Sequence, residues 1–348
     1  MKKNVAVVGY GGQGGWHANH IMKSDVVSLS GIYDIAEQKC EKARGLGIYV
    51  YSSLDEVLSD KSVDIVVVAT PNDSHREIAE RAMRAGKNVI CEKPVELSVA
   101  AFDEMMKVRD ECGVFFSVHQ NRRWDVDFLA MKDIITSDNI GEVINIESRI
   151  QGSRGIPSDW RGMKKFGGGM IYDWGVHLID QMLQLIDEKV VGVFCETTHI
   201  TNDEVDDGFK LILKFESGKR GYMEIGTYNF IAMPRFYMQC KNGSAMIEDW
   251  RQNAKVALLK AWNEKDVLPV ETAAGITKTM APRDEITLSE YEWERPLSDV
   301  HNFYRNFTSA IDGKEEQYVK NCEVRRVLRI IECAFASAER EEFIKTEI

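Results

Sequence analysis

Three side chains in this sequence have the types and spacing needed to oxidise an alcohol. Lys93 precedes Pro94 at the end of an apolar run, and Asp173 and His177 stand four residues apart. A lysine ammonium can hydrogen-bond a substrate hydroxyl and stabilise the alkoxide that forms from it. A histidine titrates near neutrality and can take the hydroxyl proton as hydride leaves the carbon. We therefore predict that Lys93, Asp173 and His177 are the catalytic residues.

Each of these side chains also has an interpretation without chemistry. A lysine at a turn is most often solvated, and an Asp–His pair on one helix face can be a satisfied buried pair. Two ligands at this spacing are too few for a metal site and no third is evident nearby, so no metal is expected. Asp173 could orient the substrate, assist His177, or do both. Gly175 lies between them in the predicted helix, and its cost of about 1 kcal/mol against alanine suggests a close approach by substrate or cofactor.

A glycine-rich turn follows the first apolar run. It contains Gly9, Gly11 and Gly14, with Gly12 and Gln13 between them, and a helical pattern follows. The first glycine allows a tight turn, the second lets the backbone approach a pyrophosphate, and the third permits close packing of helix on strand. These five residues are predicted to form a dinucleotide-binding loop.

Asp34 ends the second strand pattern at the spacing from Gly14 that dinucleotide-binding folds use, about 20 residues. An acidic residue there accepts hydrogen bonds from the adenosine ribose and repels a 2′-phosphate. We therefore expect NAD rather than NADP. The alternative is that Asp34 caps the helix that follows it.

The first 120 residues alternate strand and helix patterns, which predicts an α/β fold with a doubly wound parallel sheet of the Rossmann type. Ser53 with Glu56, and Ser74 with Glu77, resemble helix caps. In such sheets ligands bind at the carboxyl ends of strands, where Lys93 is expected. The expected strands are 4–9, 27–34, 63–70, 87–91 and 114–118, and the expected helices include 12–23, 36–44 and 98–112.

After Trp124 the pattern changes to a C-terminal α+β region whose strands follow one another, which predicts an antiparallel or mixed sheet. The triple glycine 167–169 opens a helix that runs to about residue 186. Strands are expected at 190–197, 209–215, 220–227, 236–241 and 255–261, and helices at 298–311 and 322–342. We expect an NAD-binding domain at 1–123 and a substrate and oligomerisation domain at 124–348, with the last helix free to pack back on the first. The polar segment 263–290 is a surface excursion, a lid or an oligomer contact.

Composition excludes several classes of partner. The net charge is −11 and the pI is about 5.3, which disfavours nucleic acid and anionic membranes. An anionic cofactor is still compatible, because helix N-termini bind phosphate without net positive charge. The seven cysteines are scattered without metal or redox spacing, and no apolar run approaches a membrane span. We expect a cytoplasmic protein.

Together the motifs resemble the Gfo/Idh/MocA oxidoreductases, a family that includes glucose–fructose oxidoreductase and inositol dehydrogenases. The likeness covers almost the whole chain. The motifs occur in the family's order: the glycine loop, Thr70-Pro71-Asn72 with His75, Glu92-Lys93-Pro94, Trp160-Arg161, the triple glycine and Asp173-x-Gly-x-His177.

The resemblance implies a Rossmann domain followed by a domain whose large open sheet forms homodimers or homotetramers. It implies that Lys93, Asp173 and His177 surround the reacting carbon, and that the Lys93–Pro94 bond is often cis. Residues that the resemblance places near the cofactor are Thr70, Asn72, His75, Glu92, Lys93, Gln120 or Asn121, Trp160 and Arg161. The substrate-binding set is Lys93, Asn121, Arg122, Asp173 and His177.

The run from His119 to Asp125 is similar to a branch of scyllo-inositol dehydrogenases, some of which prefer NADP. Asp34 departs from that preference, so NAD is still expected. Arg122 and Arg123 in this run either contact the substrate or form a salt-bridged hinge between domains.

The expected activity is hydride transfer between a secondary alcohol of a sugar or polyol, inositol-like or hexose-like, and NAD. A second hypothesis is a redox-neutral enzyme that keeps NAD bound and oxidises a sugar only transiently, for glycoside cleavage or epimerisation. A third is a regulator that binds dinucleotide or sugar without catalysis. Regulators in this family tend to lose the lysine or the histidine, and this chain keeps both Lys93 and His177.

Overall fold

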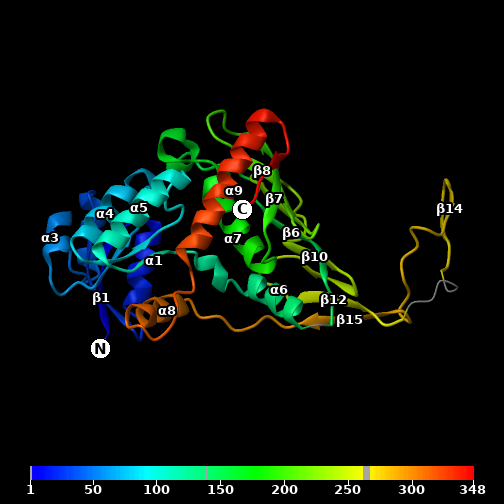
Figure 1. Ribbon diagram of the computed structural model, residues 1–348, viewed down its shortest axis with the longest axis horizontal. Helices are drawn as coiled ribbons and strands as arrows, with labels where there is room; N and C mark the ends of the chain where they lie inside the picture. Colours follow the sequence, from blue (N-terminus) through cyan, green and yellow to red (C-terminus); the bar gives the residue numbers. More distant parts are fainter. Residues whose placement is uncertain (1, 138, 262–266) are drawn as a thin grey trace.

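The computed structural model describes residues 2–137, 139–261 and 267–348. Two large sheets lie side by side with helices between them, and the N-terminal sheet and its helices form one end of the body (Figure 1). Within the described ranges, every helix is too short or too polar to cross a membrane.

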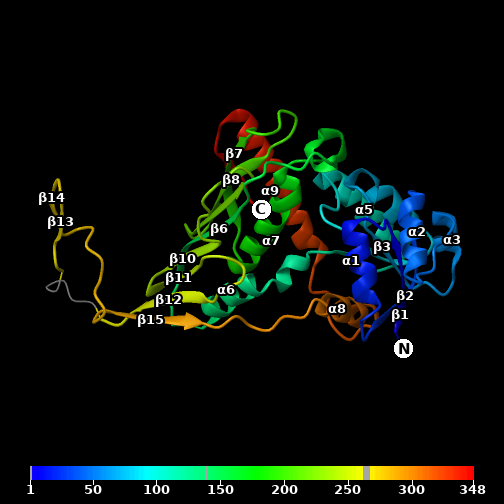
Figure 2. The ribbon, with the colours of Figure 1, turned by 180° about the vertical axis from the view of Figure 1, so that it is seen from behind.

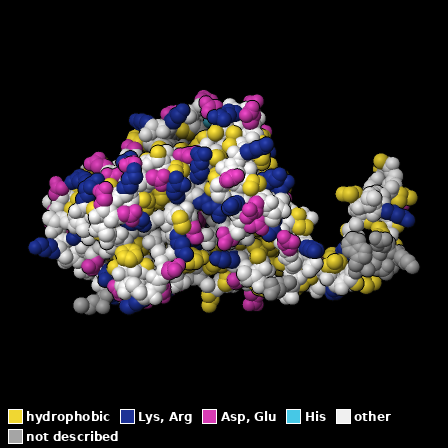
Figure 3. Space-filling view, in the orientation of Figure 1, with side chains coloured by type: hydrophobic (Ala, Val, Ile, Leu, Met, Phe, Trp, Pro, Cys, Tyr) yellow, Lys and Arg dark blue, Asp and Glu magenta, His cyan; other side chains and the backbone are white. Residues whose placement is uncertain are grey.

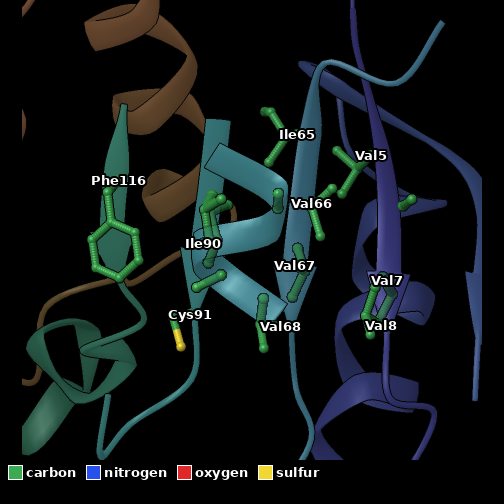
Figure 4. Close-up of a cluster of buried hydrophobic side chains, with 14 of the residues drawn as sticks. Val5, Val7, Val8, Ile65, Val66, Val67, Val68, Ile90, Cys91 and Phe116 are labelled. Atoms are coloured by element: carbon green, nitrogen blue, oxygen red, sulfur yellow. The ribbon is translucent and has the colours of Figure 1, made fainter. Parts of the chain in front are cut away.

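The N-terminal half is the expected doubly wound parallel sheet, in the order β2-β1-β3-β4-β5. Its strands supply the buried valines and isoleucines of the first core, as Figure 4 shows. The strands are β1 (Lys3–Val8), β2 (Val27–Tyr33), β3 (Ile65–Val68), β4 (Asn88–Cys91) and β5 (Phe116–Val118). The helices are α1 (Gly12–Ile21), α2 (Glu37–Gly45), α3 (Leu54–Ser59), α4 (His75–Arg84) and α5 (Val99–Cys112).

The strand order places β2 on one side of β1 and β3 on the other. The connections that leave β1 and β3 therefore open a crevice at the carboxyl ends of these two strands. Gly9 follows β1 and Thr70 follows β3, so both lie at this edge.

One of the two predicted helix caps is confirmed. Ser53 accepts a hydrogen bond from the Glu56 amide at 3.1 Å at the start of α3. Ser74 does not cap α4, so that prediction was wrong. A short 3-10 turn, η1 (Asn72–Ser74), precedes the helix, and the Ser74 hydroxyl bonds back to Thr70 Oγ1 and the Pro71 carbonyl, both at 2.8 Å.

The C-terminal half forms a mixed, mostly antiparallel sheet in the order β15-β12-β11-β10-β6-β9-β8-β7-β16. The pair β6–β9 is parallel and the other neighbours are antiparallel. The expected strands here are β7 (Val190–Thr198), β8 (Gly208–Phe215), β9 (Arg220–Gly226), β10 (Phe236–Cys240) and β12 (Ala254–Leu259). The strands that the sequence did not reveal are β6 (Val143–Gln151), β11 (Gly243–Ile247), β15 (Leu288–Trp293) and β16 (Ile344–Lys345).

One face of this sheet is covered by helices that separate it from the N-terminal half (Figures 1 and 2). They are α6 (Val126–Thr136), α7 (Val176–Leu185) and α9 (Asn321–Arg340). In β8, Phe209, Leu211 and Leu213 are buried toward these helices, while Lys210 and Lys214 are exposed on the other side. The outer face is therefore bare in the single chain.

The last helices join the two halves. Phe303 and Phe307 of α8 (Asn302–Ile311) lie in the first core. Leu328 near the start of α9 also packs in the first core, while Ile331 one turn later packs in the second. The C-terminal helix thus returns to the N-terminal half. The domain boundary at 123 falls within the turn η2 (Asn121–Trp124) and stays a prediction.

An arm, defined here as residues 267–287, extends from the edge strands β12 and β15. It points away from the N-terminal half and carries exposed hydrophobic side chains (Figures 1 and 3). Its tip is a hairpin of β13 (Val270–Thr272) and β14 (Gly275–Thr277), and Leu268 is 78% and Met280 80% exposed. The arm does not cover this chain's own crevice. Of the segment 263–290 interpreted above, residues 263–266 lie outside the described residues.

Candidate active site

A cleft of about 1070 Å³ opens at the carboxyl ends of β1 and β3 and is lined from both halves. Most residues predicted to act on cofactor or substrate line it. They are Gly9, Gly11, Gly12, Gln13, Asp34, Thr70, Asn72, His75, Glu92, Lys93, Asn121, Arg122, Trp160, Arg161, Asp173 and His177.

The glycine loop has the shape that a phosphate group needs. Gly9 has φ +90°, and a Cβ at Gly14 would lie 1.8 Å from the Gly9 carbonyl oxygen. Gly14 therefore allows helix α1 to pack on β1 and does not itself line the cleft. A Cβ at Gly11 or Gly12 would meet nothing within 4 Å, so their backbone borders open space at the start of α1. That space can admit a pyrophosphate at the helix N-terminus.

The Asp34 side chain accepts hydrogen bonds from the backbone and also lines the cleft. Its Oδ2 accepts a hydrogen bond from the Tyr10 amide at 2.6 Å, and its Oδ1 accepts one from the Ala36 amide at 2.8 Å. The alternative role as a support for the start of α2 is therefore present. Each carboxylate oxygen keeps a further acceptor site, so both can still bind ribose hydroxyls.

Lys93 enters the cleft from the turn after β4. Its bond to Pro94 is cis, as the resemblance implies. The ammonium donates to the Asp173 carbonyl at 2.8 Å and to Asp173 Oδ1 at 2.9 Å. Because an ammonium has three donors, one hydrogen of Lys93 is left for a ligand.

Asp173 lies in a π-helical turn, η5 (Ile171–Gly175), at the start of α7. The sequence predicted a plain α-helix here. Arg161 donates from Nε to Asp173 Oδ2 at 3.1 Å. Burial opposes ionisation of Asp173, but Lys93 and Arg161 outweigh it and lower the pKa of this carboxyl. In the described chain, the Asp173 side chain bonds these two cations and not His177, so it positions Lys93 rather than assisting the histidine.

His177 is buried in the first turn of α7. Its Nδ1 is closed off from solvent and has no hydrogen-bond partner among the described residues. The ring atom that faces the cleft is therefore Nε2. Burial, Lys93 and Arg122 hold the pKa of His177 well below its ordinary value. A neutral imidazole of this kind can accept a proton at pH 7.

The triple glycine fixes where the π turn starts. A Cβ at Gly168 would lie 2.3 Å from the Arg161 carbonyl oxygen, and one at Gly169 would lie 2.2 Å from Asp206 Oδ1. The other carboxylate oxygen of Asp206 accepts a hydrogen bond from the Ile171 amide at 2.8 Å. Burial raises the pKa of Asp206 to about 7. Only glycines allow the chain to approach these groups so closely.

Gly175 is explained by a contact other than the close approach of substrate or cofactor that the sequence suggested. A Cβ there would lie 3.2 Å from the Phe209 ring. The close approach is therefore made by a core side chain of β8, and it says nothing about substrate or cofactor.

His75 and Asn72 line the cleft, but their polar side-chain atoms hydrogen-bond to backbone carbonyls of the neighbouring loops. The ring nitrogens of His75 lie 3.0 Å from the Pro94 carbonyl and 2.9 Å from the Thr70 carbonyl. Asn72 donates from its side chain to the Gly167 carbonyl at 3.2 Å. They bring the turns after β3 and β4 and the triple glycine together, and a direct role toward the cofactor stays a prediction.

The turn η2 separates residues that the sequence grouped together. Gln120 is 1% exposed and lies outside the cleft, so the structure does not support it as a cofactor ligand. Arg123 is fully buried and pairs with Asp180 at 2.6 Å and with Glu323 at 2.8 Å. Arg123 therefore forms buried salt bridges and Arg122 lines the cleft, while the role of Arg123 as a hinge between domains stays a prediction.

One group of possible metal ligands occurs in the described chain, at a place the sequence did not indicate. Ligand atoms of His17, Glu92 and His119 lie within 4.8 Å of one another. Glu92 Oε1 accepts from both rings, at 2.8 and 2.6 Å, and Tyr304 bonds the other nitrogen of His17. Burial and His119 lower the pKa of His17 to about 4, so that ring is neutral. These hydrogen bonds account for the cluster without an ion.

Sequence reasoning missed several residues of the cleft. Trp174 lies inside the Asp-x-Gly-x-His motif and could have been found there. Asp159 precedes the Trp-Arg step and pairs with Arg161 at 2.8 Å. Ile35 follows Asp34 and is 91% exposed. Thr227 comes from the end of β9, and nothing in the sequence signals that it reaches the cleft.

Comparison with known families gives two adjoining matches. Residues 3–120 match the profile described as "Oxidoreductase family, NAD-binding Rossmann fold", and residues 128–246 match the "GFO/IDH/MocA C-terminal domain". The chain belongs to the Gfo/Idh/MocA oxidoreductase family. Its members share a Rossmann fold that binds a nicotinamide dinucleotide, in agreement with the loop after β1.

Individual relatives agree with this family. A structure described as an NAD-binding protein from Listeria innocua superposes with a TM-score of 0.96 at 40% identity, over 99% of this chain and 100% of that one. An uncharacterized oxidoreductase of Schizosaccharomyces pombe is 38% identical, but this chain spans only 47% of its length and the match covers 48% of this chain. The scyllo-inositol 2-dehydrogenase (NADP(+)) of Bacillus subtilis is 26% identical over 99% of this chain and 96% of its own.

Proposed function

We propose that this protein is an NAD-dependent dehydrogenase acting on a secondary alcohol of a sugar or polyol. The observation that carries the proposal is the composition of one cleft. A glycine loop with Asp34 lies at the carboxyl end of the parallel sheet, and Lys93 and His177 line the same cleft. The family supplies the oxidoreductase class, and the relative named as an inositol dehydrogenase supports a polyol substrate.

The residues divide the reaction between them. His177 Nε2 takes the hydroxyl proton, and the third hydrogen of Lys93 bonds the alkoxide that forms. Asp173 holds the Lys93 ammonium through its side chain and its carbonyl. The nicotinamide, when bound beside them, would accept the hydride from the carbinol carbon. A neutral His177 and an ionised Asp173 are the protonation states that this division needs.

The preference for NAD rests on Asp34. Its carboxylate repels a 2′-phosphate, so the change Asp34→Ser should lower the ratio of NAD to NADP efficiency by about 10-fold or more. The variant Asp110→Ser, on the exposed face of α5, is the control. The measurement is kcat/KM with each cofactor. An unchanged ratio in Asp34→Ser, or a wild-type protein that prefers NADP, contradicts this preference.

A panel of inositols, hexoses, uronates and glycosides, with NAD and NADP, tests the activity itself. Net dehydrogenation releases one reduced cofactor for each alcohol oxidised. Conversion of a sugar with bound NAD and no net release supports the redox-neutral hypothesis instead. Normal cofactor binding with no conversion across the panel supports a regulator.

We propose further that two or more copies assemble through the bare face of the large sheet. Alternating strands bury one face against helices and leave the other exposed. The arm that extends from the sheet edge carries hydrophobic side chains without cover. We also propose that the protein is cytoplasmic.

A further inference from the structure

Glu92, the residue before Lys93, places a buried carboxylate in the wall of the cleft. Its side chain is 8% exposed, and it lines the same cleft as Lys93 and His177. Glu92 Oε1 accepts hydrogen bonds from His17 Nε2 at 2.8 Å and from His119 Nδ1 at 2.6 Å. Its Oε2 accepts one from the Lys93 backbone amide at 3.3 Å. The proposed reaction uses none of these contacts.

The two histidines keep Glu92 ionised. Burial opposes ionisation of a carboxyl, but His119 and His17 outweigh it and hold the pKa of Glu92 well below its ordinary value. The Tyr304 hydroxyl lies 2.6 Å from His17 Nδ1. A neutral His17 can therefore accept from this hydroxyl at Nδ1 while it donates to Glu92 from Nε2. The hydrogen bonds around Glu92 thus fit a carboxylate anion.

Glu92 and Asp173 differ in the charge of their partners. Asp173 pairs with Lys93 at 2.9 Å and with Arg161 at 3.1 Å, and both of these cations are permanent. Among the described residues, Glu92 pairs with imidazoles only. Burial and His119 lower the pKa of His17 to about 4, so this partner is uncharged at neutral pH. The negative charge of Glu92 is therefore not offset by a lysine or an arginine.

The charge of Glu92 acts at the reacting end of the cleft. Burial, Lys93 and Arg122 lower the pKa of His177, and Glu92 opposes them. A field that favours a positive charge on His177 favours one on any other group beside it. The nicotinamide ring is positively charged when it is oxidised and neutral when it is reduced. A fixed anion in this wall of the cleft therefore favours the oxidised ring.

We propose that Glu92 stabilises the positive charge of the oxidised nicotinamide, so that the cleft binds NAD in preference to NADH. His17 and His119 are positioning residues, because they hold the carboxylate in place. The inference rests on the proposed NAD cofactor, but it does not depend on which alcohol is oxidised. It gives a task to a buried group that the alcohol chemistry leaves unused.

The test is the ratio of two dissociation constants, for NAD and for NADH, measured separately by calorimetry without substrate. We expect the wild type to bind NAD at least as tightly as NADH. Glu92→Gln removes the charge but keeps an oxygen that can accept from both imidazoles. In this variant we expect NAD binding to weaken by about 10-fold relative to NADH binding. The NADH dissociation constant itself should stay within about 3-fold of wild type.

Two controls separate the charge of Glu92 from the packing around it. Tyr304→Phe removes the hydrogen bond to His17 but leaves the carboxylate, so the ratio should stay within about 2-fold of wild type. Glu104→Gln removes an exposed carboxylate of α5 outside the cleft, and the ratio should again be unchanged.

Glu92→Asp shortens the side chain but keeps the charge. We therefore expect its ratio to lie closer to that of the wild type than the ratio of Glu92→Gln does. If the glutamine variant folds poorly, the wild type still provides a test. A wild-type protein that binds NADH about 10-fold more tightly than NAD overturns the inference.

Three further results would also overturn it. They are equal weakening of NAD and NADH binding in Glu92→Gln, which a merely structural role predicts, an unchanged ratio in that variant, or an equal change in Glu104→Gln. The expected change of ratio in a protein that oxidises no alcohol would leave this inference standing and contradict the proposed dehydrogenase. Oxidation of an alcohol, with an unchanged ratio in Glu92→Gln, would do the reverse.

Discussion

At the scale of single residues, the site depends on which protonation states burial allows. His177 lies in a low-dielectric position beside two cations, so its pKa lies well below the usual value. Asp173 stays ionised because Lys93 and Arg161 compensate for its burial. The pair therefore offers a neutral base and a fixed anion at neutral pH, which the sequence spacing alone did not determine.

The depressed pKa of His177 has a consequence for the pH profile. The base must be neutral to act, and its pKa is lowered, so activity should persist below the pH at which an ordinary histidine becomes protonated. We expect the acid limb of kcat/KM to fall below pH 6.5. Removing the positive charge in Arg122→Gln should move this limb to higher pH. A limb at or above 6.5 in the wild type contradicts the assignment of His177.

Residue types and motifs predicted most of the lining of the cleft, because glycines, Asp34 and the Lys-Pro step carry requirements that few other residues meet. The same reasoning failed at the turn η2 and at Gln120, the residue before it. Gln120, Arg122 and Arg123 are close in sequence, but a tight turn has no regular period, so neighbours point to different surroundings. Which arginine faces the ligand follows only from packing against Trp174 and from the buried partner Asp180.

At the scale of elements, the triple glycine controls the geometry of Asp173. Gly168 has no room for a side chain, because the Arg161 carbonyl occupies the place of its Cβ. Any displacement there moves Arg161 and the start of the π turn together. Glycine is thus required at these positions because neighbouring protein atoms leave no room for a Cβ, and not because a ligand approaches them.

This predicts a specific effect of Gly168→Ala. We expect a loss of about 1–3 kcal/mol in the free energy of unfolding, since overpacking forces the backbone to shift, together with reduced turnover. The control is Gly45→Ala at the end of α2, where a Cβ meets nothing within 4 Å. It should be neutral or slightly stabilising. Denaturant titration and kcat measure the two effects, and equal stabilities of the two variants would falsify this account of the glycine.

Three of the strands that the sequence did not reveal, β6, β11 and β15, each lack a clear strand pattern. In β6, Ser148 lies on the buried face and Ile144 is exposed, so the apolar alternation that marks a half-buried strand is broken. The edge strand β15 has no deeply buried residue, and β11 begins with small residues of low strand preference. The parallel strands of the first half were predicted because both of their faces are buried.

At the scale of the whole molecule, a wide sheet with one bare face and an arm with exposed hydrophobic residues are unusual for a monomer. A two-stranded hairpin is marginally stable alone in water, so the tip of the arm needs a surface to pack against. A second copy related by two-fold symmetry would supply that surface to both arms at once.

We therefore expect light scattering to give a mass of at least twice the 39.6 kDa of one chain. Replacing residues 268–286 by a short glycine–serine linker should weaken the assembly, so that dissociation occurs at a protein concentration about 10-fold higher or more. The linker variant should keep its affinity for NADH, because the arm lies away from the N-terminal half. A wild-type protein that stays monomeric at every concentration contradicts this expectation.

The central claim is that Lys93 acts on the substrate alcohol at one end of a dinucleotide cleft. The most direct measurement is turnover and NADH affinity of Lys93→Ala, with Lys107→Ala on α5 as the matched control, using the best substrate of the panel. The account predicts a loss in kcat of about 100-fold or more, an NADH dissociation constant within about 3-fold of wild type, and normal values for the control. Turnover by Lys93→Ala close to that of the wild type would contradict it.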